Sequence, residues 1–64
     1  MYKNIRREMG ANEISILSLS TILGISQKSM SNKLSGRTEF KRSEMIKLCN
    51  HLNVSMEYLF SEDQ

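Results

Sequence analysis

The sequence is short of the features that stabilise or mark many other classes of small protein. Its 64 residues include no proline, no tryptophan and only one cysteine. A single cysteine excludes an intrachain disulfide, and with His51 as the only histidine beside Cys49 there is no Cys/His cluster for a structural zinc. No apolar run approaches the roughly 18 residues that span a bilayer. We therefore expect efficient helix packing, or oligomerisation, to stabilise the chain.

The same scarcity indicates the fold class. Average usage of about 5% proline would give roughly three in this length, and Val54 is the only valine among few good strand formers. Isoleucine, leucine and methionine instead recur at helical intervals. With 39% hydrophobic and 25% charged residues, the composition is that of a folded domain. The sequence predicts one all-α domain over residues 1–64.

Charge is small in total but unevenly spread. The formal net charge is +2. Residues 28–47 hold six basic residues against two acidic ones, a balance of +4, whereas residues 48–64 hold three acidic residues and no lysine or arginine. A basic middle followed by an acidic end favours an anionic partner for the middle. No secretory pattern opens the chain, so we expect a cytoplasmic location with a reduced cysteine.

Apolar spacing predicts the helices. Ile5 and Met9 set the inward side of a first helix over about 2–12, with residues 6–8 facing solvent and Gly10 a place where the helix frays or ends early.

Two further helices are predicted close together, over about 15–23 and 26–35. Ser15 and Ser26 are good N-cap residues, and Gly24 can adopt the positive φ that ends a helix. Two helices joined by a few residues that include glycine are the sequence form of a helix-turn-helix, whose second helix lies in the DNA major groove.

The chain then turns back towards the core. Gly36 is the expected C-cap of the third helix, Phe40 the first residue of the loop able to return inward, and a fourth helix is predicted over about 42–52. Ser55 caps a short fifth helix that carries Met56, Leu59 and Phe60.

Nearly the whole chain resembles one known family. The stretch ISILSLSTILGISQKSMSNKLSG, with NIRREM before it and EFKRSEMIKLCNHLNVSMEYLF after it, resembles the Xre/Cro/cI-like helix-turn-helix repressors, most of all their short phage- and prophage-type members. The resemblance implies a five-helix lambda-repressor-like domain with its helix-turn-helix at about 15–35. It implies base reading by Gln27, Lys28, Ser31 and Asn32, and phosphate contacts by Ser15, Ser26, Ser35, Arg37, Thr38 and Lys41.

The chemistry of the base-reading set agrees with that role. Glutamine and asparagine can form paired hydrogen bonds with adenine, lysine can donate to guanine, and serine is short enough for a close contact. Helical spacing places Met30 and Leu34 on the opposite, inward side of the same helix.

The chain also departs from the family pattern. The first position of the second helix is often glutamine in the family, but here it is Ile16, followed by Leu17. These residues indicate extra core, a dimer surface or a weaker phosphate contact, with core favoured. Lys33 stands where many members have an apolar residue, so the core anchor is expected to shift to Leu34.

The function that follows is sequence-specific regulation of transcription by operator occupancy. The implied partner is double-stranded DNA with a palindromic operator, bound by a homodimer. No metal, cofactor, small-molecule ligand or membrane is expected. An enzyme is disfavoured because Cys49 and His51 are two residues apart on one predicted helix and point in different directions.

Two alternatives stay open on the same fold. One is a protein-binding module, such as an antitoxin or anti-repressor, which apolar Ile16 and Leu17 and the acidic end with Tyr58 and Phe60 would serve. The other is a recombination directionality factor that bends DNA.

Overall fold

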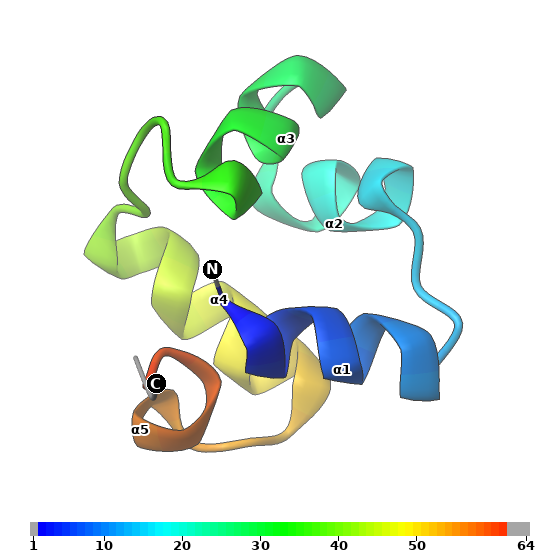
Figure 1. Cartoon of the computed structure of the whole chain (residues 1–64), viewed down its shortest axis with the longest axis vertical. Helices are drawn as coiled ribbons and strands as arrows, with labels where there is room; N and C mark the ends of the chain where they lie inside the picture. The colour runs from blue at the N-terminus through cyan, green and yellow to red at the C-terminus, as the bar shows by residue number, and fades with distance from the viewer. Residues whose placement is uncertain (1, 62–64) are drawn as a thin grey trace.

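A computed structural model describes residues 2–61, which form five helices and no strand. In chain order these are α1 (Lys3–Ala11), α2 (Ile16–Leu23), α3 (Gln27–Ser35), α4 (Arg42–Leu52) and α5 (Met56–Leu59) (Figure 1). The all-α prediction is confirmed, and each predicted helix is present with its ends within a few residues of the predicted ones. Over residues 2–61 no helix is long and apolar enough to cross a membrane.

The predicted range of about 2–12 for the first helix is confirmed, and α1 does not end early at Gly10. The helix continues through Gly10 to Ala11. Its end is closed by the backbone and side-chain amides of Asn12, which both donate to the Glu8 carbonyl oxygen, at 3.0 and 2.9 Å. These bonds satisfy a carbonyl at the end of the helix, which offsets the poor helix propensity of glycine.

Glu8 was also expected to face solvent, and it is half-buried instead. Its Oε2 accepts a hydrogen bond of 3.0 Å from the Tyr58 hydroxyl. Beside it, the Asn4 side chain donates to the Tyr58 carbonyl oxygen at 2.7 Å. These bonds join α1 to α5, which pack against each other. The hydrogen bond to Glu8 is the main reason that the pKa of Tyr58 is raised, because it stabilises the protonated hydroxyl.

The helix contacts form a series in which α4 joins α2 and α3 to α5 and α1. Helix α2 packs on α3 and on α4, while α5 packs on α4 and on α1. Figure 1 shows α3 at the opposite end of the molecule from α5, with α2 and α4 between them. Helix α3 is therefore supported from one side and open on the other.

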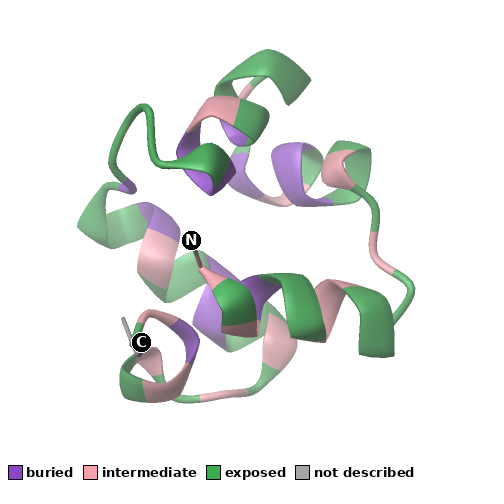
Figure 2. Ribbon diagram, in the orientation of Figure 1, coloured by how far each residue is buried: buried purple, intermediate pink, exposed green. Residues whose placement is uncertain are grey.

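The core lies where the inward sides of all five helices meet, as the distribution of buried residues in Figure 2 shows. Burying a side chain of this size is worth about 1.5–3 kcal/mol. The predicted anchors of α3, Met30 and Leu34, are confirmed in this core. The largest fully buried side chains are Ile5, Leu19, Met30, Leu34, Leu48 and Leu59.

Three aromatic rings pack together where residues from both ends of the described chain meet the segment before α4. Tyr2, Phe40 and Phe60 contact one another edge to face. The ring centroid of Tyr2 lies 5.2 Å from that of Phe40 and 6.0 Å from that of Phe60, and the two phenylalanine centroids are 5.3 Å apart. The prediction that Phe40 returns to the core is confirmed. Phe60 and the half-buried Tyr58 are thus engaged within the chain, which weakens the case for them as a protein-binding surface.

Candidate nucleic-acid interface

Local backbone and capping chemistry builds the junction between α2 and α3. Gly24 ends α2 with φ of 71°, a left-handed conformation that favours glycine. The Ile25 N–H donates to the Ser20 carbonyl oxygen at 3.0 Å, and α3 starts directly afterwards with Ser26, whose Oγ accepts from the Ser29 N–H at 3.0 Å. Ser20 is buried. The predicted helix-turn-helix is confirmed, with a small residue on the buried side of α2.

Helix α3 has one buried side and one exposed side. Met30, Lys33 and Leu34 are buried. Gln27, Lys28 and Ser31 are exposed, as predicted. An exposed helix side that offers amide, ammonium and hydroxyl groups has the size and chemistry to enter the DNA major groove and contact base edges.

Asn32, the fourth residue of the predicted base-reading set, is half-buried, whereas the other three are exposed. The chain after Gly36 folds back over the end of α3, so that the Arg37 and Thr38 N–H groups both donate to the Asn32 carbonyl oxygen, at 2.9 and 3.4 Å. Asn32 therefore contributes less surface to the exposed side of α3 than the sequence indicated.

The residues predicted to contact phosphates fall into two chemical groups. The hydroxyls of the three serines, Ser15, Ser26 and Ser35, already take part in local hydrogen bonds with Ser18, Ser29 and the Asn32 carbonyl oxygen. The other group lies in the segment that follows α3 and is exposed: Arg37, Thr38 and Lys41. Ser15 and Ser26 are thus N-caps, whereas Arg37 and Lys41 carry positive charge at the surface, so the predicted phosphate contacts of these two residues have the stronger chemical basis.

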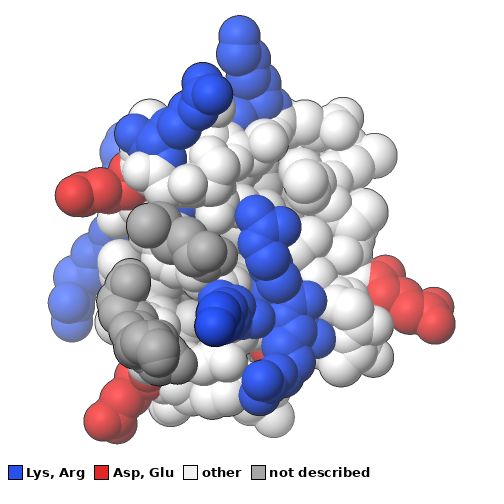
Figure 3. Space-filling model, in the orientation of Figure 1, with Lys and Arg blue, Asp and Glu red and all other residues white. Residues whose placement is uncertain are grey.

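Figure 3 shows how the basic residues are distributed over one face of the molecule. Lys and Arg side chains project at the top of the view, over α3, and a second group lies in front, where α1 begins. Lys3, Arg6 and Arg7 of α1 are exposed. Within residues 28–47 the exposed cations are Lys28, Arg37, Lys41, Arg42 and Lys47, so the basic character of this segment reaches the surface.

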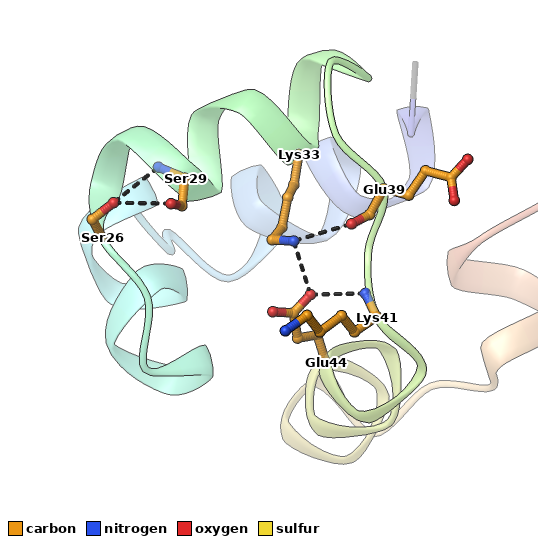
Figure 4. Close-up of polar contacts among 6 residues, drawn as sticks. All are labelled: Ser26, Ser29, Lys33, Glu39, Lys41 and Glu44. Carbon is orange, nitrogen blue, oxygen red and sulfur yellow. Dashed lines mark hydrogen bonds and ion pairs between the residues drawn. The ribbon is translucent and has the colours of Figure 1, made fainter.

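One residue of α3 has a role that the sequence did not indicate. Lys33 is 8% exposed, and its ammonium lies 3.1 Å from Glu44 Oε1 and donates to the Glu39 carbonyl oxygen at 3.0 Å. The same Oε1 of Glu44, which is 7% exposed, accepts from the Lys41 N–H at 2.8 Å. Figure 4 shows these contacts joining α3, the segment before α4 and α4 itself.

The partners of Glu44 keep it ionised. Burial acts to raise the pKa of its carboxyl, but the hydrogen bond from the Lys41 N–H and the nearby Lys33 ammonium outweigh burial and lower that pKa below its ordinary value of 4.5. The expectation that Leu34 replaces position 33 as the core anchor was incomplete, because both positions are buried. Helical spacing held the signal: Lys33 follows Met30 by three residues, and Glu44 precedes Leu48 by four.

Ile16 and Leu17, at the start of α2, differ in environment. Ile16 is half-buried and packs against the core, as favoured. Leu17 is 55% exposed, so the core expectation was wrong for it. Leu17 precedes buried Leu19 by two residues, which places it about 200° around the helix from that side chain.

The thiol and the imidazole are in different environments. Cys49 is buried, and burial raises the pKa of its thiol, which disfavours the reactive thiolate. His51 is exposed. Residues 2–61 contain no group of three or more histidine, cysteine or acidic residues that could hold a metal ion.

Comparison with known proteins gives one family. The model of the Cro/C1-type HTH DNA-binding domain matches residues 4–61, which is nearly the whole chain. No curated protein and no solved structure matches the chain.

Proposed function

The chain belongs to the Cro/C1-type helix-turn-helix DNA-binding family, and we propose that it is a sequence-specific transcriptional regulator of the short, Cro-like phage or prophage type. In this proposal it represses transcription by occupying an operator in the cytoplasm. It acts without catalysis and without a cofactor, so that occupancy of the operator follows protein concentration.

The exposed side of α3 is the observation that carries the proposal. Gln27, Lys28 and Ser31 are exposed there, while Met30 and Leu34 fix the helix to the core from behind. Amide and ammonium groups on a rigid helix can discriminate base pairs by their donor and acceptor patterns in the major groove. Exposed Arg37, Thr38 and Lys41, which follow on the chain, supply groups for the phosphates beside that groove.

Occupation of a palindromic operator by a homodimer is part of the same proposal. Half-sites of helix-turn-helix proteins lie about one DNA turn, roughly 34 Å, apart. The longest extent of this chain's Cα trace is 26 Å. One copy therefore covers one half-site, and two copies related by a twofold axis fit a symmetric site.

Binding-site selection from a random DNA pool, followed by salt-titrated affinity measurements, tests the proposal. We expect a selected sequence with inverted repeats, bound at least about a thousandfold more tightly than random DNA. Weak binding without sequence preference, and with the salt dependence of phosphate contacts alone, would contradict it.

Two alanine variants test the division between base reading and phosphate contact. Gln27→Ala should change the preferred base at one position of each half-site and cost about 1–3 kcal/mol on the selected sequence. Arg37→Ala should weaken binding to all sequences alike and reduce the salt slope by about one unit. If both variants lose affinity equally on every sequence, the two roles are not divided in this way.

A protein-binding function, such as that of an antitoxin or anti-repressor, is the second candidate. Exposed Leu17 and Ile46, at 55% and 42%, support it because they are the large apolar side chains most open to a partner. Purification from the native host distinguishes the two functions. A stable complex with another protein that excludes selected DNA would favour this candidate, and Leu17→Ser should then disrupt the complex while leaving DNA binding unchanged.

A further inference from the structure

We propose that Lys33 is a positioning residue for DNA binding, which holds the α3–α4 loop (residues 36–41) in place against α3. The inference rests on the proposed function, because it assigns the loop as the part of the interface that contacts phosphates. The contact between Lys33 and Glu39 is the observation from which it starts.

The α3–α4 loop is attached to α3 at two points. At its start, the Arg37 N–H bonds the Asn32 carbonyl oxygen at 2.9 Å. Two residues later, the Lys33 ammonium donates a hydrogen bond to the Glu39 carbonyl oxygen at 3.0 Å. Exposed Arg37 carries the first attachment, and exposed Thr38 lies between the two. Their distance from the exposed side of α3 is therefore set by these two attachments.

Lys33 acts through the loop because its own charge is not available to DNA. The side chain is 11% exposed and its ammonium lies against Glu44. A further contact comes from the Phe40 ring, whose centroid lies 6.0 Å from the ammonium nitrogen. An ammonium that already contacts a carboxylate, a carbonyl oxygen and an aromatic ring fixes the positions of these groups and is not available to bind a phosphate.

Glu44 extends the connection to α4. Its Oε1 binds the Lys33 ammonium and the Lys41 N–H together, at 3.1 and 2.8 Å. Lys41 is the N-cap residue of α4. Removal of the Lys33 side chain therefore takes away the attachment of the α3–α4 loop at Glu39, whereas the bond between Glu44 and the Lys41 N–H does not depend on it.

The double variant Lys33→Met/Glu44→Gln isolates this connection. Methionine fills the volume of the lysine stem without a donor, and glutamine leaves no unpaired buried charge while keeping an acceptor oxygen for the Lys41 N–H. The net charge of the protein does not change. Lys47→Met/Glu57→Gln, which makes the same two substitutions at exposed residues, is the matched control.

DNA binding is the first measurement. At a temperature where both double variants are folded, Lys33→Met/Glu44→Gln should bind every sequence about tenfold more weakly, a change of about 1.4 kcal/mol. Its salt slope should fall by about one unit with the base preference unchanged, since a phosphate contact is lost. A merely structural role for Lys33 would leave the slope of the folded variant unaltered. The control variant should match the wild type.

Amide hydrogen exchange in the absence of DNA is the second measurement. The Arg37 and Thr38 amides, which bond the Asn32 carbonyl oxygen, should exchange faster in Lys33→Met/Glu44→Gln than in the wild type because the loop beside them loses its attachment at Glu39. The Lys41 amide, which keeps an acceptor on the side chain at position 44, and the amides of α1 should not. Unchanged exchange in the loop, or wild-type affinity and slope, would overturn the positioning role. If the wild type itself shows no sequence preference, the proposed function fails, but the exchange result still decides whether Lys33 holds the loop.

Discussion

The two junctions on either side of α3 are built in different ways. The turn before α3 consists of Gly24, a serine N-cap and backbone hydrogen bonds between near neighbours in sequence. The α3–α4 loop after it depends on Lys33 of α3 and Glu44 of α4, eleven positions apart, and on the buried ring of Phe40. One junction is thus local, and the other needs the whole fold.

This difference separates two requirements of a DNA-reading helix. The crossing of α2 and α3 sets the angle at which the exposed side of α3 meets the groove, and a short turn of fixed backbone conformation provides it. The position of the α3–α4 loop, which we propose contacts phosphates, depends on a buried ion pair in addition to its backbone bonds to Asn32. The loop junction should therefore be more sensitive to the loss of one side chain, and the following predictions test that ranking.

The largest effect is expected for Lys33→Ala. The substitution leaves the Glu44 carboxylate buried without its cationic partner, which costs about 3 kcal/mol. Urea denaturation followed by circular dichroism measures the change. Lys47→Ala removes an exposed cation from α4 and should change stability by no more than about 0.5 kcal/mol. Equal effects from the two variants would mean that the buried pair contributes nothing to the loop junction.

Gly24→Ala should cause the next largest loss of stability. The backbone at position 24 has a left-handed conformation, which costs an alanine about 1–2 kcal/mol. No heavy atom lies within 4 Å of a Cβ added at Gly24, so the cost is conformational rather than steric. Gly10 in α1 has the same open surroundings without a positive φ. Gly10→Ala should therefore stabilise the protein by about 0.5–1 kcal/mol, and thermal melts of the pair should move in opposite directions.

Ser26→Ala removes the N-cap of α3 and should cost about 1 kcal/mol of unfolding free energy. Its Oγ is the acceptor for the Ser29 N–H, which would be left to solvent. Ser31→Ala, at an exposed interior position of the same helix, is the control and should be neutral or slightly stabilising. If Ser26→Ala lowered the unfolding free energy as much as Lys33→Ala does, the predicted ranking of the two junctions would be wrong.

The smallest effect concerns pH. Because the pKa of Glu44 is lower in the folded chain than its ordinary value of 4.5, its contribution to stability is complete above that value and is lost as the pH falls through the folded pKa. Stability should therefore decline less in acid for Glu44→Gln than for the wild type, as denaturation curves at pH 3 to 6 can measure. The serine and glycine of the first junction do not titrate, so Ser26→Ala should retain the wild-type acid dependence.

Much of the fold follows from local sequence patterns. Glycine at 24 and 36 and serine at 15, 26 and 55 mark helix ends through backbone conformation and capping, which depend on neighbours along the chain. The end of α1 also agrees with the predicted range of about 2–12, and Asn12, the last residue of that range, closes the helix. The exposure of Gln27, Lys28 and Ser31 likewise followed from helical spacing around Met30 and Leu34.

The sequence by itself determined the helices, their caps and the family, since each depends on residue type and spacing along the chain. Only the tertiary structure decided which distant groups pair with Lys33 and Tyr58. A lysine carries the same charge in any sequence, but its burial depends on whether a distant carboxylate lies within reach. Spacing along one helix cannot supply that distance, because it arises only when α3 and α4 pack into one core.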